Sequence, residues 1–115
     1  SFEAGRREML RLLKGDPAEA WFGGDDVLSI GALSALRDHG LRVPEDVGII
    51  GVNDMQIAGW QNIDLTTIRQ PIPQIVTSSI ELMLTMLKDR DRPPETRIFG
   101  CEIVERGPLP ADPSR

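Results

Sequence analysis

Three short apolar segments, each followed at once by polar residues, constrain the fold of this chain most. Residues 20–23, 47–52 and 66–69 are typical of strands that are buried in a parallel sheet. A helical segment at 26–39 joins the first two strands, and its short connections predict a right-handed parallel βαβ unit. The third strand follows a loop or short helix at 55–64. The sequence therefore predicts an α/β fold.

Further helical segments precede and follow this unit. Apolar residues recur at helical spacing over 3–14 and over 73–88, and Pro73 stands at a favourable first helical position. A polar connection leads from there to one or two edge strands within 97–104. The first helix has no strand before it, and the strands are few for a doubly wound sheet. We therefore expect an incomplete part of a parallel-sheet αβα sandwich.

The length of the chain, 115 residues, suits one domain, and we expect residues 1–107 to form it. The polar, proline-rich segment 108–115 is predicted to be a disordered tail. No apolar run approaches the ~20 residues that a membrane span requires. The N-terminus lacks the pattern of a signal peptide, but the chain begins without Met and we expect further sequence upstream of Ser1.

Charge and reactive residues narrow the classes of function. The net charge of −5 argues against this segment gripping a nucleic acid backbone by itself. Cys101 is the only cysteine, so neither an intrachain disulfide nor a cysteine-based metal site can form. His39, the only histidine, stands next to a helix-ending glycine and has no partner nucleophile in any recognisable pattern. No metal site and no cofactor is predicted.

A polar side chain follows each of the three predicted strands. Asp25 comes after the first strand, Asn53 after the second and Gln70 after the third. Ligands of parallel α/β sheets bind outside the carboxyl ends of the strands. Carboxylate and amide groups at such an edge suit ligands that are rich in hydroxyl or amide groups. These three residues are therefore predicted to line a small-molecule site.

Two further acids lie beside these residues and allow other interpretations. Asp26 is interpreted as the N-cap of the helix at 26–39, and Asp54 as a cap or turn residue of the next segment. An alternative function is a small α/β enzyme in which Asp25 and Asp54 act as acid and base. No catalytic residue is assigned, because the sequence offers no nucleophile and no obvious second base.

Several motifs resemble those of LacI/GalR-family transcriptional regulators. Residues 24–33, Gly-Asp-Asp-Val-Leu-Ser-Ile-Gly-Ala-Leu, resemble the family's Ala-Asn-Asp-x-x-Ala-x-Gly-Ala. Residues 40–54 resemble its Gly-x-x-Val-Pro-x-Asp-Ile-x-Ile-x-Gly and the Phe-Asp-Asp that follows. Residues 65–71, Leu-Thr-Thr-Ile-Arg-Gln-Pro, match its Leu-Thr-Thr-Ile-x-Gln-Pro, and residues 102–107 resemble its closing segment. The resemblance spans nearly the whole chain in order.

This resemblance implies a periplasmic-binding-protein-like effector domain, of which the chain would be the C-terminal part. In the family, two α/β subdomains enclose a cleft that holds a sugar, nucleoside or similar small effector. The matching positions imply effector contacts at Asp25, Asn53, Gln70 and Ile72. Asp25 stands where the family usually has Asn, and Asn53 where it usually has Asp. The pair still consists of one acid and one amide, but the negative charge stands at position 25 instead of position 53.

The resemblance also implies partners. The family dimerises side by side through these domains, which makes Ile30, Trp60 and Gln61 candidates for the dimer interface. Its DNA-reading helix-turn-helix lies at the N-terminus and is absent from this chain. We therefore expect a cytoplasmic bacterial regulator, without enzymatic activity, whose homodimer binds operator DNA in response to an effector. The alternative is a periplasmic sugar-binding receptor of a transporter.

Overall fold

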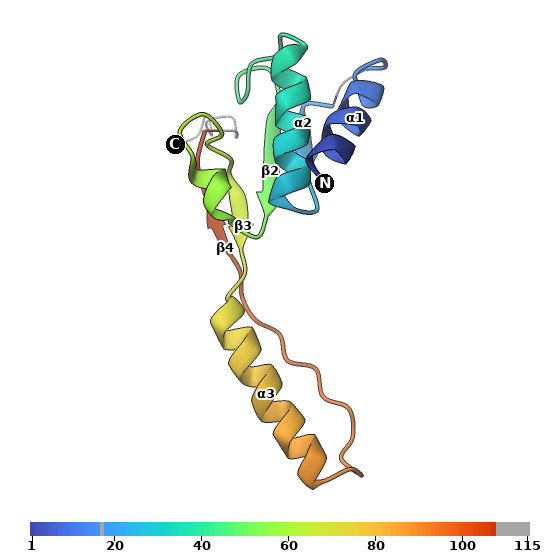
Figure 1. The fold of residues 1–115 in the computed structure, drawn as a ribbon, viewed down its shortest axis with the longest axis vertical. Helices are drawn as coiled ribbons and strands as arrows, with labels where there is room; N and C mark the ends of the chain where they lie inside the picture. The colour runs from blue at the N-terminus through green and yellow to red at the C-terminus, as the bar shows by residue number, and fades with distance from the viewer. Residues whose placement is uncertain (17, 108–115) are drawn as a thin grey trace. The chain divides into compact units, whose positions relative to one another are not determined.

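The computed structural model describes residues 1–16 and 18–107, so the predicted tail at 108–115 lies outside the described residues (Figure 1). These residues form two compact units. Among the described residues, the sheet unit comprises Ser1–Arg69 and residues 102–107, and the helix unit comprises Gln70–Cys101. The elements in order are α1 (Phe2–Leu12), β1 (Ala20–Phe22), α2 (Asp26–Asp38), β2 (Gly48–Val52), the 3-10 helix η1 (Gln56–Gly59), β3 (Thr67–Arg69), α3 (Ile72–Lys88) and β4 (Glu102–Val104).

The strands of the sheet unit are ordered β1-β2-β3-β4. β1, β2 and β3 run parallel, and β4 pairs antiparallel with β3 at the edge. The predicted α/β fold with a mainly parallel sheet is therefore confirmed. One edge strand forms within the predicted range 97–104. Only the last three residues of that range, Glu102–Val104, pair with the sheet.

The core of the sheet unit lies around α2. Leu33, Leu36 and Ile49 are each 1% exposed or less. Burying an aliphatic side chain of this size stabilises a fold by about 1.5–3 kcal/mol. The residues that make up the core are Met9, Leu13, Ile30, Ala32, Leu33, Ala35, Leu36, Val47, Ile49, Ala58 and Leu65.

Two glycines allow α1 and α2 to lie side by side at close range (Figure 1). A Cβ atom on Gly5 would lie 2.0 Å from the carbonyl oxygen of Leu28. A Cβ atom on Gly31 would lie 2.0 Å from the carbonyl oxygen of Phe2. Because both neighbours are backbone atoms, neither clash could be relieved without moving a helix. One glycine on each helix therefore allows this close approach of α1 and α2.

The helix unit has no core of its own. Residues 89–101 run back along α3 (Figure 1), and Arg97 Nη1 donates to the carbonyl oxygen and to the hydroxyl of Ser78 at 3.2 and 2.9 Å. The predicted helix is confirmed, but α3 contains no buried residue. Its exposed large apolar side chains are Ile72, Val76, Ile80, Met83, Leu84, Met86 and Leu87. Among the described residues, no helix is long and apolar enough to cross a membrane.

Candidate functional site

The register of the sheet brings two of the predicted site residues to one edge. Phe22, the last residue of β1, pairs with Ile50, two residues before β2 ends at Val52. Asp25 follows Phe22 by three residues, and Asn53 follows Ile50 by three. The amide of Asn53 donates to the carbonyl oxygen of Ile68 at 2.8 Å, which ties the end of β2 to β3. Asp25 and Asn53 therefore leave the carboxyl ends of adjacent strands.

Asp25, and not Asp26, is the N-cap of α2. Its backbone is extended, with φ −153° and ψ 169°, and its side-chain Oδ1 accepts from the amide of Leu28 at 2.6 Å. The prediction that Asp26 caps the helix was wrong, because Asp26 is already helical and its side chain turns inward. An N-cap of this type contributes about 1 kcal/mol. Asp25 is half-buried, and a carboxylate that caps with one oxygen can still accept from a ligand with the other.

Asp26 is fully buried and joins three parts of the sheet unit. Its Oδ2 accepts from the amide of Met55 at 2.7 Å, and its Oδ1 accepts from the hydroxyl of Thr67 at 2.5 Å. Gly51 provides the space, since a Cβ atom there would lie 2.4 Å from Asp26 Oδ1. The start of α2 is thereby attached both to β3 and to the β2–β3 connection, residues 53–66.

The β2–β3 connection begins with two residues in unusual backbone conformations. Asn53 has φ 107° and Asp54 has φ 50°. A non-glycine residue in a sparsely populated region costs of the order of 1–3 kcal/mol, although Asn and Asp tolerate the left-handed region best. Met55 stands at the N-cap position of η1, so the cap role, one of the two roles predicted for Asp54, was wrong.

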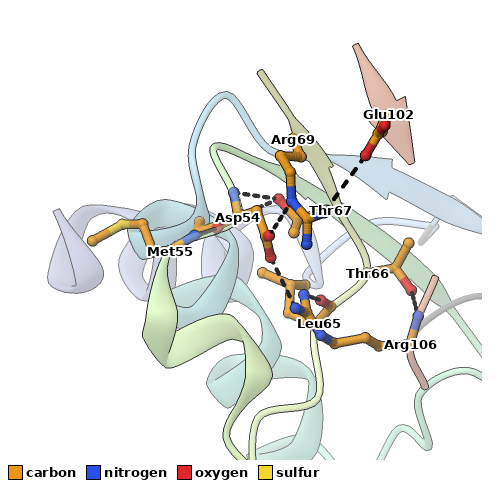
Figure 2. Close-up of polar contacts among 9 residues, drawn as sticks. Asp54, Met55, Leu65, Thr66, Thr67, Arg69, Glu102 and Arg106 are labelled. Carbon is orange, nitrogen blue, oxygen red and sulfur yellow. Dashed lines mark hydrogen bonds and ion pairs between the residues drawn. The ribbon is translucent and has the colours of Figure 1, made fainter. Parts of the chain in front are cut away.

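Two arginines hold the carboxylate of Asp54 (Figure 2). Its Oδ2 lies 2.7 Å from Arg69 Nε and its Oδ1 lies 2.8 Å from Arg106 Nη2. Burial alone raises the pKa of this carboxyl, but the hydrogen bonds and charges of Arg106 and Arg69 lower the pKa by more. Asp54 is therefore ionised at neutral pH with both oxygens engaged. This arrangement does not favour the alternative in which Asp54 exchanges protons with a substrate.

Arg106 attaches the chain after β4 to the two residues that precede β3. Its amide donates to the hydroxyl of Thr66 at 2.7 Å, and its Nη1 donates to the carbonyl oxygen of Leu65 at 2.9 Å (Figure 2). Neither Arg69 nor Arg106 was predicted as a site residue. The available signal was Asp54 itself, because an acid beside buried strands requires a compensating charge.

The other predicted ligand contacts belong to the helix unit. Ile72 is the first residue of α3 and is 51% exposed. Its amide donates to the carbonyl oxygen of Gln70 at 2.9 Å. Because Gln70 and Ile72 lie outside the sheet unit, the sheet edge itself brings together only Asp25 and Asn53.

The candidate interface residues differ in exposure. Trp60, which follows η1, is 56% exposed, and Gln61 beside it is exposed. Ile30 is 5% exposed and packs in the core, so it offers little surface to a second chain. Within the described part of the chain, no three His, Cys, Asp or Glu side chains come together as a metal site.

Comparison with known proteins identifies the family. Residues 1–108 match the model of the periplasmic binding protein-like domain. The HTH-type transcriptional repressor CytR of Escherichia coli K12 is 36% identical over 114 residues, which cover 98% of this chain and 33% of that protein. The chain thus spans about a third of the length of this relative.

Solved structures agree with the family match. A LacI-family transcriptional regulatory protein from Corynebacterium glutamicum is 40% identical, with a TM-score of 0.77, over 94% of this chain and 42% of that one. A LacI family regulator from Enterococcus faecium with bound ribose is 27% identical (TM-score 0.77; 95% and 40% covered). The lac repressor dimer, bound to operator and an anti-inducer, is 25% identical (TM-score 0.84; 96% and 39% covered). The chain belongs to the periplasmic binding protein-like domain family and corresponds to part of the effector-binding domain of LacI/GalR-type transcriptional regulators.

Proposed function

We propose that this chain is the C-terminal portion of the effector-binding and dimerisation domain of a ligand-responsive bacterial repressor. One observation carries the proposal: Asp25 and Asn53 leave the carboxyl ends of adjacent parallel strands, where ligands of α/β folds bind. Gln70 and Ile72 of the helix unit are the further proposed contacts. The family match over residues 1–108 supports the assignment.

The chemistry of the two leading residues suits a sugar or a nucleoside-like molecule. The Asp25 carboxylate can accept from ligand hydroxyls, and the Asn53 amide can both donate and accept. Together they would orient neighbouring hydroxyl groups by short hydrogen bonds. The ribose in the regulator from Enterococcus faecium supports this class of ligand.

The proposed mechanism is a shift between two conformational populations. The effector binds one relative orientation of the subdomains better than another, and the affinity of the dimer for operator DNA changes with it. DNA binding requires a helix-turn-helix that is not part of this chain. The regulator acts in the cytoplasm and catalyses no reaction. The repressor function of CytR supports this proposal over a transport receptor.

The decisive experiment separates ligand binding from helix capping. Serine caps a helix about as well as Asp, so Asp25→Ser retains the cap and loses the carboxylate. Asp25→Ser and Asn53→Ala in the intact regulator should each weaken binding at least tenfold when ribose and the common ribonucleosides are titrated calorimetrically. Asp16→Ser, at an exposed residue after α1, is the matched control and should bind as the wild type does. Unchanged affinity in both site variants would remove the site assignment.

A second measurement separates the regulator from the transport receptor. A regulator should shift the mobility of DNA taken from its own promoter region, and the ligand identified by titration should change that shift. A transport receptor would leave the mobility of the DNA unchanged at every ligand concentration.

A further inference from the structure

The backbone at Asn53, the proposed effector contact, needs external support. Asn53 and Asp54 are consecutive non-glycine residues with φ 107° and φ 50°. Asn53 itself is exposed, and its amide donates to the carbonyl oxygen of Ile68 at 2.8 Å. Such conformations persist where the surroundings over-determine them. The contacts of Asp54, the next residue in the chain, provide such surroundings.

Asp54 makes three separate attachments. Its amide donates to the hydroxyl of Thr67 at 3.3 Å. Its two carboxylate oxygens bind Arg69 and Arg106 at 2.7 and 2.8 Å (Figure 2). The side chains of Asp54 and Arg106 are only 11% and 20% exposed, so water screens this pair less than an exposed surface pair. We name these three residues, Asp54, Arg69 and Arg106, the Asp54 clamp.

The clamp also lies where the chain leaves and re-enters the sheet unit. The sheet unit ends at Arg69 and resumes at Glu102. These two residues are register partners in β3 and β4, and Arg69 Nη1 lies 3.5 Å from Glu102 Oε2. The carboxylate of Asp54, the residue directly after Asn53, thus binds the last residue of β3.

We propose that Asp54 is a positioning residue, which through Arg69 and Arg106 holds the backbone of Asn53 in its ligand-binding conformation. This inference rests on the proposed role of Asn53 as an effector contact. In this proposal Asp54 acts through its neighbour, and each of its carboxylate oxygens already binds an arginine. The Asp54 carboxylate thereby fixes the backbone next to Asn53 to Arg69, where the chain leaves the sheet unit.

The test replaces the charge without disturbing the turn. Asp54→Asn has nearly the same shape, and Asn tolerates the left-handed region as well as Asp does. Asp64→Asn is a matched control in the same β2–β3 connection. Asp64 has φ 50° and its carboxylate accepts from the amide of Gly107 at 3.2 Å, without an arginine. Amide hydrogen exchange in the intact protein, without ligand, is the first readout.

Asp54→Asn should speed exchange of the amides of Asn53 and Met55 at least tenfold and leave α2 unchanged. Asp64→Asn should leave the amide of Asn53 as in the wild type. If Asp54→Asn perturbs the whole protein, Arg69→Gln provides a milder test, because Arg69 is 51% exposed. Wild-type exchange at Asn53 in every folded clamp variant would overturn the proposal. The exchange readout decides the positioning of Asn53 even where Asn53 proves not to touch a ligand.

Binding supplies a readout that a purely structural role would not move. Using ribose as the probe, Asp54→Asn should weaken affinity about as much as Asn53→Ala does. The double variant should bind no more weakly than Asn53→Ala alone, because Asp54 acts only through Asn53. Additive losses would overturn the positioning role. If Asn53→Ala and Asp54→Asn both leave ribose binding intact while exchange at Asn53 rises, the clamp stands and the proposed effector contact fails.

Discussion

The hydroxyl of Thr67 donates a 2.5 Å hydrogen bond to Asp26 Oδ1, across 41 positions of the sequence. Both side chains are completely buried. The bond joins the start of α2 to the first residue of β3, and so connects the βαβ unit to the strand that follows it. The second oxygen of Asp26 accepts from the amide of Met55. These two hydrogen bonds of Asp26 support the sheet edge that carries Asp25 and Asn53.

Thr67→Val should therefore destabilise the protein more than loss of a surface hydroxyl would. Valine has the shape of threonine but leaves Asp26 Oδ1 buried without its donor. An unsatisfied buried polar group costs about 1–3 kcal/mol, and a charged group costs more. Urea unfolding of the intact protein measures the change in the free energy of unfolding. Thr77→Val, at an exposed position on α3, is the control and should change that free energy by less than about 0.5 kcal/mol. Equal effects would contradict the importance of this bond.

The capping role of Asp25 predicts a second difference in stability. Asp25→Ala removes the acceptor for the amide of Leu28 and should lower the free energy of unfolding by about 0.5–2 kcal/mol. Asp25→Ser and Asp25→Asn keep an acceptor at this position and should lower it by only a few tenths. Thermal unfolding of the three variants under the same conditions measures their order of stability. If Asp25→Ala were as stable as the other two, the assignment of the N-cap would be wrong.

The interchange of Asp25 and Asp26 shows where sequence reasoning ends. Among the described residues, short apolar segments and helical spacing predicted the three α-helices and the three parallel strands, because apolar periodicity is visible in the local sequence. Two adjacent acids at a helix start look equivalent in sequence, and only the packing of Asp26 against Thr67 assigns their roles. The ion pair of Asp54 with Arg106 spans 52 positions and leaves no local pattern. Such contacts depend on how the strands come together.

The ion pairs of Asp54 predict a dependence of stability on pH. The pKa of Asp54 is lowered below its ordinary value of 3.8 in the folded chain, because the arginines outweigh the effect of burial. A group with a lowered folded-state pKa stabilises the fold fully above the ordinary value. This stabilisation is lost as the pH falls through that value toward the folded-state pKa.

The free energy of unfolding of the wild type should therefore exceed that of Asp54→Asn by about 1–2 kcal/mol at pH 7. This is the contribution of a hydrogen bond to a charged group, reduced because Arg69 is half exposed to solvent. The difference should shrink as the pH falls below about 4. Asp46, whose pKa Arg42 lowers to about 2, is present in both proteins, so its contribution cancels. Urea unfolding at a series of pH values measures the difference, and a constant difference would exclude ionisation as its source.

The close contact of α1 with α2 predicts a strong effect of one added methyl group. In Gly31→Ala the new Cβ would lie 2.0 Å from the carbonyl oxygen of Phe2 and 2.9 Å from the amide of Arg6. Overpacking of this kind costs about 1–3 kcal/mol or more. Gly24→Ala is the matched control, since a Cβ there meets no atom within 4 Å. In thermal unfolding, the melting temperature of Gly31→Ala should be clearly lower than that of Gly24→Ala. The reverse order would show that α1 can move freely.

Helix α3 shows a different limit of the sequence. Its apolar stripe predicted a helix, and the helix forms, yet none of its residues is buried among those that the structure describes. Periodicity indicates that a face is apolar but does not say which surface covers it. The predicted contacts Gln70 and Ile72 share this limit, because they belong to the helix unit and not to the sheet edge. A pattern on one element cannot reveal a partner at a distance in sequence.

The exposed tryptophan after η1 predicts an effect on assembly. Trp60 is 56% exposed and Met55, at the other end of η1, is 41% exposed, which gives this short helix an apolar surface. Aromatic side chains with exposed area are enriched where protein surfaces meet. Trp60→Ala in the intact protein should weaken the proposed dimer at least tenfold, measured by sedimentation equilibrium. Leu10→Ala on α1, where the leucine is 37% exposed, is the control and should leave the association constant unchanged. A dimer that is unaffected by Trp60→Ala would place the interface on another surface.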